Sequence, residues 1–215
     1  MQRRSRRMID LLAARWRVIG CIDLIAGPDL ASRTVEPAIF LEFLRGRLCR
    51  LFIRTPDDLA ERLADLDRRP DPDGRFRVNQ LFCSGEIWKT AVTTLMSKAS
   101  FVVMDLRGFG PERRGCVFEL QTLLDTVEVS KLVLLVDATS DRKSLEQVLQ
   151  ERWRLLDVNS PNLASERPEL VLYDLSARES RVVRALLQAA EALPASKAIG
   201  QEADAARARL MPIGP

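Results

Sequence analysis

The sequence predicts a doubly wound, flavodoxin-like α/β domain: a three-layer sandwich of about five parallel strands with helices on both faces. Three observations predict it. Short apolar runs rich in branched residues alternate with longer segments of helical periodicity. The runs are almost continuously apolar, as strands buried on both faces are. The chain has 215 residues, 47% of them hydrophobic, which is enough to close one sizeable core.

The first half of the chain begins this alternation. An apolar run at 18–25 is the first expected strand, and apolar residues at near-helical spacing over 35–52 indicate an amphipathic helix. A second helix is expected after Thr55, because Thr is a good N-cap and Pro56 suits the first turn. A stretch rich in Pro, Asp and Gly then predicts a turn into a strand at 76–82.

The second half continues in the same way. The expected helices are at 88–96, 116–127, 145–153 and 182–193. The expected strands are at 101–104, 132–136 and 170–173. Strands that alternate with helices at this spacing imply right-handed crossovers and a parallel sheet.

The domain organisation follows from these patterns. We expect a basic arm or helix at 1–15 and a single α/β domain at 16–193. Residues 194–215 are small, charged and without a clear pattern, so they are expected to form a tail that is partly helical at best.

Composition excludes several classes of function. No histidine occurs, which removes Ser-His-Asp and Cys-His catalysis and His-ligated metal sites. Carboxylates must therefore carry any acid–base chemistry. The formal net charge is +3, but the arginines at 3–7 supply four positive charges and the rest lacks the basic footprint of a nucleic-acid binder. We expect no nucleic acid, metal or organic cofactor.

Cysteines and apolar segments bear on the compartment. Cys21, Cys49, Cys83 and Cys116 are too far apart for a metal knuckle and sit among apolar neighbours, as reduced core thiols do. No signal peptide or membrane-spanning run is visible. We expect a cytoplasmic protein. Its Arg-rich start is either a solvated tail or a contact with the anionic inner face of a membrane.

The candidate site lies where the strands end, because ligands of open parallel sheets bind outside the carboxyl ends of the strands. The residues at these places are Gly27, Pro28 and Asp29 after the first run, and Asp105, Arg107 and Gly108 after the third. Glycine there lets the backbone approach a ligand, and proline stiffens the turn.

Acidic residues follow three of the runs, at Asp105, Asp137 and Asp174. Each is also a normal cap or turn former. Together they could hold Mg²⁺ for phosphoryl chemistry. No Gly-rich phosphate loop with Lys and Ser or Thr accompanies them, so metal binding is the minor option.

Glu119 is the most specific candidate because of its place on the expected helix. The apolar positions from Cys116 to Val127 fall within a narrow arc, and Glu119 lies about 60° to the other side of Cys116 at roughly 100° per residue. It borders the buried stripe, where burial adjusts the pKa of a carboxyl group. The alternative is a partly exposed Glu that the helix dipole stabilises.

Two short segments stand in an informative order. Ala26-Gly27-Pro28 follows the first strand, and Gly115-Cys116-Val117-Phe118-Glu119-Leu120 follows the third. Together they resemble the nucleoside 2-deoxyribosyltransferase family, which has an Ala-Gly-Pro turn and then a Gly-Thr-x-x-Glu-Leu segment whose Glu attacks the sugar. That family usually has an acidic residue before its Gly, whereas Arg113 and Arg114 stand here and favour an anionic ligand such as a nucleotide or NAD.

The second segment also resembles the Cys-x-x-Glu-Leu of Toll/interleukin-receptor (TIR) domains, which share this architecture and in some members cleave NAD through that Glu. Both families break or exchange an N-glycosidic bond, and this chemistry suits a site without histidine. The whole chain also resembles the soluble carboxyl-terminal part of bacterial multi-span membrane proteins of unknown function. That resemblance implies a role at a membrane face.

Two hypotheses follow. In the first, the chain is a nucleotide or NAD glycohydrolase or transferase in which Glu119 and Asp105 are catalytic. Its ligand would be held by Gly27, Pro28, Asp29, Arg107, Gly108, Arg114 and Gly115. In the second, the chain is a non-catalytic TIR-like module that senses a nucleotide or self-associates as a homo-oligomer, and Glu119 is merely solvated. The first requires Pro28 and Glu119 to face a shared pocket.

Overall fold

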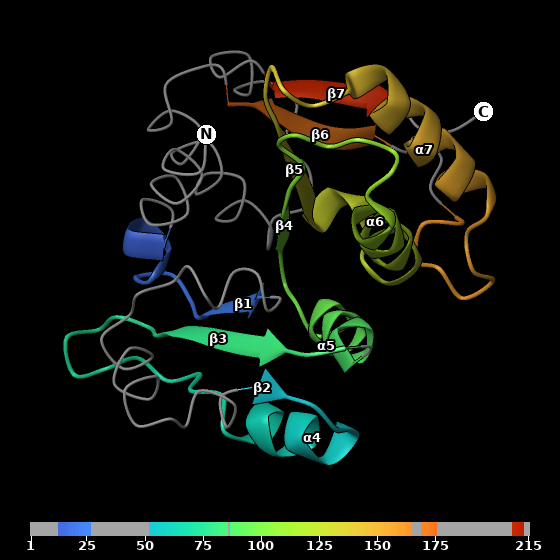
Figure 1. Ribbon diagram of the computed structural model, residues 1–215. Coiled ribbons are helices and arrows are strands. Elements are labelled where there is room, and N and C mark those ends of the chain that lie inside the picture. Colours follow the sequence, from blue (N-terminus) through green and yellow to red (C-terminus); the bar gives the residue numbers. More distant parts are fainter. Residues whose placement is uncertain (1–12, 27–51, 86, 165–168, 176–207, 213–215) are drawn as a thin grey trace. The chain divides into compact units, whose positions relative to one another are not determined.

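The computed structural model describes residues 13–26, 52–85, 87–164, 169–175 and 208–212. The chain divides into two compact units, Met1–Leu95 and Met96–Pro215. Each unit contains parallel strands and helices, which confirms the predicted α/β class (Figure 1). The hydrogen-bonded strands form a three-stranded and a four-stranded sheet instead of the single five-stranded sheet that was expected. The single domain at 16–193 stays a prediction.

The first unit is built on a three-stranded parallel sheet. Its strands are β1 (Ile22–Ala26), β2 (Phe52–Ile53) and β3 (Val78–Cys83), in the order β1-β3-β2. Strand β3 lies in the middle: Ile22 pairs with Val78 on one side and Phe52 pairs with Phe82 on the other. The expected strand at 18–25 is therefore confirmed over 22–25 and the expected strand at 76–82 over 78–82, while residues 18 and 19 lie in an exposed turn.

The described part of this unit also contains helix α4 (Pro56–Ala64), helix α5 (Ile87–Met96) and a short helical stretch at 13–16. Thr55 caps α4 as predicted, since its side chain accepts from the N–H of Asp58 while the Asp58 carboxylate accepts from the N–H of Thr55, both at 3.1 Å. The core of the unit consists of Ile53, Leu59, Leu81, Cys83, Ile87, Ala91 and Leu95.

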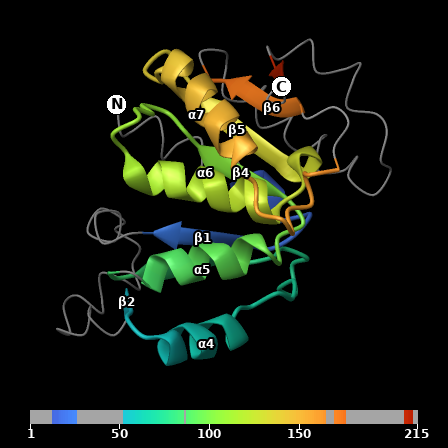
Figure 2. The ribbon, with the colours of Figure 1, turned by 90° about the vertical axis from the view of Figure 1, so that its right-hand side faces the viewer.

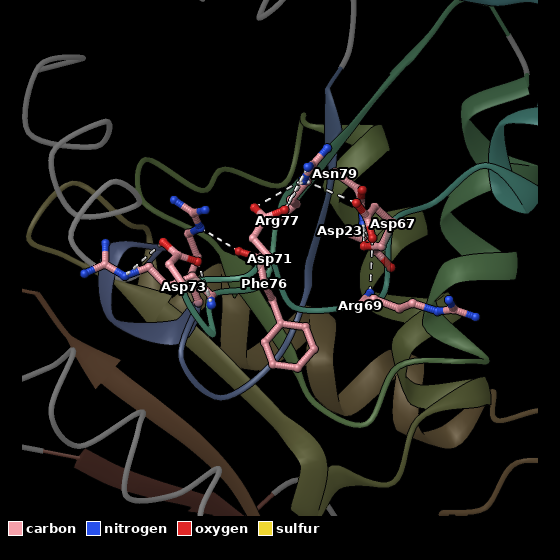
Figure 3. A network of polar contacts seen from close by, with 10 residues as sticks. Asp23, Asp67, Arg69, Asp71, Asp73, Phe76, Arg77 and Asn79 are labelled. Carbon is pink, nitrogen blue, oxygen red and sulfur yellow. Dashed lines mark hydrogen bonds and ion pairs between the residues drawn. The ribbon is translucent and has the colours of Figure 1, made fainter.

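A polar network joins β1 and β3 near their amino ends (Figure 3). The Asn79 amide donates to the Asp23 carboxylate at 2.8 Å and to the carbonyl of Asp67 at 3.2 Å. The Arg77 guanidinium forks onto Asp71, and these hydrogen bonds lower the pKa of the Asp71 carboxyl. Because ligands of parallel sheets bind at the carboxyl ends of strands, we assign this network to structure.

The second unit contains the larger sheet. Strands β4 (Val102–Asp105), β5 (Leu132–Val136) and β6 (Glu169–Asp174) are parallel, and β7 (Ala208–Pro212) pairs antiparallel with β6. Every residue of β5 is buried, as its continuous apolar sequence predicts.

Helices α6 (Arg114–Thr126) and α7 (Arg142–Arg154) connect these strands and lie side by side against the sheet (Figures 1 and 2). A 3₁₀ turn, η2 (Val129–Lys131), leads into β5. The main core joins strand residues such as Leu134 and Leu172 to Leu120, Leu123 and Leu124 of α6.

The carboxyl end of α6 is held by the segment that follows α7. The Asn162 amide nitrogen donates to the carbonyls of Leu124 and Val127 at 2.7 and 2.8 Å, and its oxygen accepts from the N–H of Val129 at 3.0 Å. The Ser160 hydroxyl also donates to Leu124 at 2.7 Å. Asn162 is 2% exposed, so these bonds satisfy buried backbone groups at the helix end.

Two expectations are corrected. Phe52 was expected to end a helix over 35–52 but belongs to β2, because its pairing with Phe82 of β3 overrides the helical spacing of the apolar residues before it. The tail expected at 194–215 contains β7, which adds backbone hydrogen bonds to β6. The rest of that helix, residues 35–51, and the helix expected at 182–193 lie outside the described residues.

Candidate functional site

The described part of the candidate site begins where β4 ends. Leu106 continues the strand direction, since its N–H donates to the carbonyl of Leu135 at 2.8 Å. Asp105 stands before it with a side chain that is 33% exposed. Arg107 turns back onto Asp105, and its own side chain is only 9% exposed. The predicted pair thus presents a carboxylate to solvent and buries the guanidinium behind it.

Gly108 makes the turn that follows. Its φ is +67°, a left-handed conformation that glycine adopts without strain. The Arg113 guanidinium and the Thr139 hydroxyl each lie 3.7 Å from the point where a Cβ would stand. The Ser140 hydroxyl donates to the carbonyl of Leu106 at 2.9 Å and thereby ties the loop after β5 to the loop after β4.

Helix α6 carries Glu119 in its second turn. Leu120, Leu123 and Leu124 are fully buried, and Glu119 borders them as a half-buried residue, which confirms the predicted face of the helix. Burial raises the pKa of the Glu119 carboxyl. In the part of the chain that the structure describes, no residue donates a hydrogen bond to it. The carboxylates that cap helices behave in the opposite way: hydrogen bonds from Ser144 lower the pKa of Asp141.

Cys116 shows which charged groups lie near one another. Burial raises the pKa of its thiol, the negative charges of Glu119 and then Asp105 raise it further, and the positive charge of Arg113 opposes them. Glu119, Asp105 and Arg113 therefore lie close enough to Cys116 to influence it. The end of β4 and the first two turns of α6 form one neighbourhood.

The other acidic strand ends have partners of their own. Asp137 accepts from the hydroxyl of Thr139 at 2.5 Å, and Asp174 accepts from the guanidinium of Arg142 at 2.6 Å. Within the described ranges, no three His, Cys, Asp or Glu residues are grouped so that they could hold a metal ion. The carboxylates at the ends of β4, β5 and β6 thus each form hydrogen bonds with a different side chain.

The structure brings together one half of the predicted site. Asp105, Arg107, Gly108 and Glu119 share the neighbourhood around Cys116 and the β4 loop, while Arg114 and Gly115 form the exposed first turn of α6. Gly27, Pro28 and Asp29 lie outside the described residues, so their side of the site is a prediction.

Two neighbours were missed from the sequence. Thr139 and Ser140 belong to the loop after β5, and they contact the β4 loop through Gly108 and Leu106. The polar run from Asp137 to Asp141 directly after a buried strand was the available signal.

No described helix is both long and apolar enough to cross a membrane. Comparison with models of known families, with curated proteins and with solved structures finds no match to this chain. Function therefore has to be inferred from the chain's own residues.

Proposed function

We propose that this chain binds a nucleotide or NAD and acts on its N-glycosidic bond, as a glycohydrolase or a transferase, through the carboxyl group of Glu119. One observation carries the proposal. Glu119 is half-buried, its pKa is raised by burial, and no described residue donates a hydrogen bond to it. A carboxyl group that is partly desolvated and makes no hydrogen bond to the described residues is typical of a catalytic residue.

The chemistry suits such a group. Cleavage of an N-glycosidic bond leaves the bonding electron pair on the departing base and develops positive charge on the sugar carbon. A poorly solvated carboxylate stabilises that charge or attacks the carbon, and water or a second base then completes hydrolysis or transfer. Asp105, 33% exposed in its side chain and close to the same thiol as Glu119, is the second carboxylate of the proposal.

The remaining predicted residues complete the proposed binding site. Gly108 and Gly115 would let the backbone approach the ligand, the exposed Arg114 would favour its negative charge, and Arg107 would take part through its pair with Asp105. Gly27, Pro28 and Asp29, in the predicted turn after the first strand, would complete the set of residues that hold the ligand.

Turnover tests this proposal. The purified chain is incubated with NAD and, separately, with deoxynucleosides, and the released base is measured. Glu119→Gln keeps the shape of the side chain, and we expect it to slow release by about a hundredfold or more. Glu146→Gln, the same change at an exposed position of α7, is the matched control and should leave the rate unchanged. Release that survives Glu119→Gln removes this residue from the mechanism.

One observation favours a second candidate, a TIR-like module that senses a nucleotide or self-associates. Leu155, Val158 and Leu163 are 61%, 84% and 55% exposed within one short segment after α7. Three exposed apolar residues within nine positions of the chain are a candidate interaction surface. Absence of turnover, together with a mass in light scattering that rises with concentration and falls in Val158→Ser, would support this candidate.

The proposal also includes a place in the cell. We expect action in the cytoplasm, at or near the inner face of a membrane that the Arg-rich residues 3–7 contact, and without nucleic acid as a partner. The free thiols of Cys21, Cys83 and Cys116 support a reducing compartment. Binding to vesicles that contain anionic lipid, compared with neutral vesicles, tests the membrane contact.

A further inference from the structure

Arg107 and Asp105 form a bidentate ion pair, and its geometry gives the two residues different roles that the sequence alone did not distinguish. Oδ1 of Asp105 accepts from the backbone N–H of Arg107 at 3.1 Å and from its Nε at 2.8 Å. Oδ2 accepts from Nη2 at 2.5 Å. Two parallel N–H to oxygen bonds of this kind fix both the position and the plane of a carboxylate.

The burial of the two side chains differs. The Arg107 side chain is 9% exposed and the Asp105 side chain is 33% exposed. A buried guanidinium requires its counter-charge, so Arg107 stays with Asp105 and is not released to a ligand. An ionised carboxylate offers about four lone-pair sites, of which Arg107 occupies three, so about one acceptor site remains, on Oδ2.

The remaining acceptor restricts the chemistry of the group that meets it. A phosphate would bring like charge against Asp105, whereas a hydroxyl group donates to a carboxylate and satisfies it. The ribose of a nucleotide supplies such a hydroxyl on C2′, next to the glycosidic carbon, and another on C3′, one carbon farther away. The position of Asp105 at the carboxyl end of β4, beside the first turns of α6, suits a group adjoining the bond on which Glu119 is proposed to act.

We propose that Asp105 is a specificity residue which accepts a hydrogen bond from a ribose hydroxyl, that Arg107 is its positioning residue, and that the site therefore binds a nucleotide with this hydroxyl more tightly than a deoxynucleotide that lacks it. This inference rests on the proposed function in taking the ligand to be a nucleotide. It gives Arg107 a role through Asp105 instead of a contact with phosphate.

Binding tests this directly and needs no turnover. AMP, 2′-deoxy-AMP and 3′-deoxy-AMP are titrated calorimetrically into the full chain carrying Glu119→Gln, so that the ligands stay intact. A hydrogen bond to a charged acceptor predicts that AMP binds about tenfold to a hundredfold more tightly than one of the deoxy forms. Asp105→Asn on the same background should remove most of that ratio.

Arg107→Lys separates positioning from structural support. Lysine keeps the positive charge but cannot form the fork, so we expect the ratio of AMP to deoxy-AMP affinity to fall while the thermal transition persists. A purely structural role would weaken all three ligands equally and leave the ratio unchanged. Arg142→Lys, which alters the comparable pair with Asp174 at the end of β6, is the control and should keep the ratio.

The outcomes distinguish this inference from the proposed function. Equal affinities for the three ligands, or no binding of AMP, would overturn the inference. If NAD is nevertheless cleaved by the unaltered chain and not by Glu119→Gln, the proposed reaction stands without it. If the ribose preference depends on Asp105 and Arg107 but no base is released, the specificity assignment stands and the proposed reaction falls.

Discussion

Asn162 offers a stability prediction whose size follows from the structure. Asn162→Ala removes three hydrogen bonds at the carboxyl end of α6. The Leu124 carbonyl keeps the Ser160 hydroxyl as a donor. The Val127 carbonyl and the Val129 N–H lose the bonds that Asn162 made to them.

The magnitude comes from those two groups. A buried polar group left without a partner costs about 1–3 kcal/mol, so the substitution should lower the free energy of unfolding by about 2–6 kcal/mol. Water that enters the space left by the side chain would bring the loss toward the lower figure. Asn162→Asp keeps the oxygen that accepts from the Val129 N–H, but it replaces the amide nitrogen with an oxygen that faces the carbonyl oxygens of Leu124 and Val127. We therefore expect Asn162→Asp to destabilise the fold as well.

Urea denaturation followed by circular dichroism measures this loss. Asn159→Ala is the matched control in the same segment: Asn159 is exposed, its side-chain amide donates to the Asp157 carboxylate at 3.1 Å, and the change should stay within about 0.5 kcal/mol. If Asn162→Ala also changed the free energy of unfolding by less than about 0.5 kcal/mol, the hydrogen bonds of Asn162 at the end of α6 would not stabilise the fold as expected.

Three further predictions concern the site and the helix caps. Burial raises the pKa of Glu119 in the folded chain, so the fold favours the protonated carboxyl group over the carboxylate. This stabilisation is present below the ordinary pKa of 4.5 and is lost as the pH rises through the raised pKa. Glu119→Gln should therefore be more stable than the unaltered chain at neutral pH, with the gap closing in acid; thermal melts across pH check this, and a gap that widens in acid would contradict it. Thr55→Ala removes the cap of α4 and should cost about 1 kcal/mol, while Thr55→Ser should cost less; equal melting temperatures for all three chains would show that the cap does not matter. Gly108→Ala places a Cβ on a left-handed residue and should cost about 1–2 kcal/mol, and Gly108→Asn less, because asparagine tolerates that conformation; a reversed order in denaturant titrations would refute the backbone argument.

Local patterns predicted much of the fold. The runs at 101–104, 132–136 and 170–173 are β4, β5 and β6 to within a residue or two at each end. The helix after Thr55 begins where its cap and proline place it. These elements depend on periodicity and capping, which are encoded within a few residues of one another.

The features that the sequence did not predict depend on partners that lie far away along the chain. Phe52 continues a helical pattern and becomes a strand residue only because β3 lies beside it. Asn162 looks like an ordinary loop residue, and its importance comes from carbonyls 35 and 38 positions away. The division of the strands into two sheets is likewise a property of pairing and not of any single run.

For the site, the helical pattern placed Glu119 at the margin of the buried stripe, and the structure has it there. The sequence also singled out Asp105 and Arg107 as neighbours of a ligand. It could not separate them, because which of the two side chains is buried depends on the packing around the β4 loop. The turn at 27–29 stays a prediction.

Strand β7 has a practical consequence for anyone who shortens this chain. A boundary drawn after residue 193 would discard residues 208–212, and with them the neighbour that occupies one side of β6. The backbone N–H and C=O groups of the alternate β6 residues that β7 pairs with would then face water along an edge that is mostly apolar. Exposed edges of this kind recruit strands from other molecules. If such a shortened protein aggregated, the cause would be the loss of β7 from the edge of the sheet and not an unstable core.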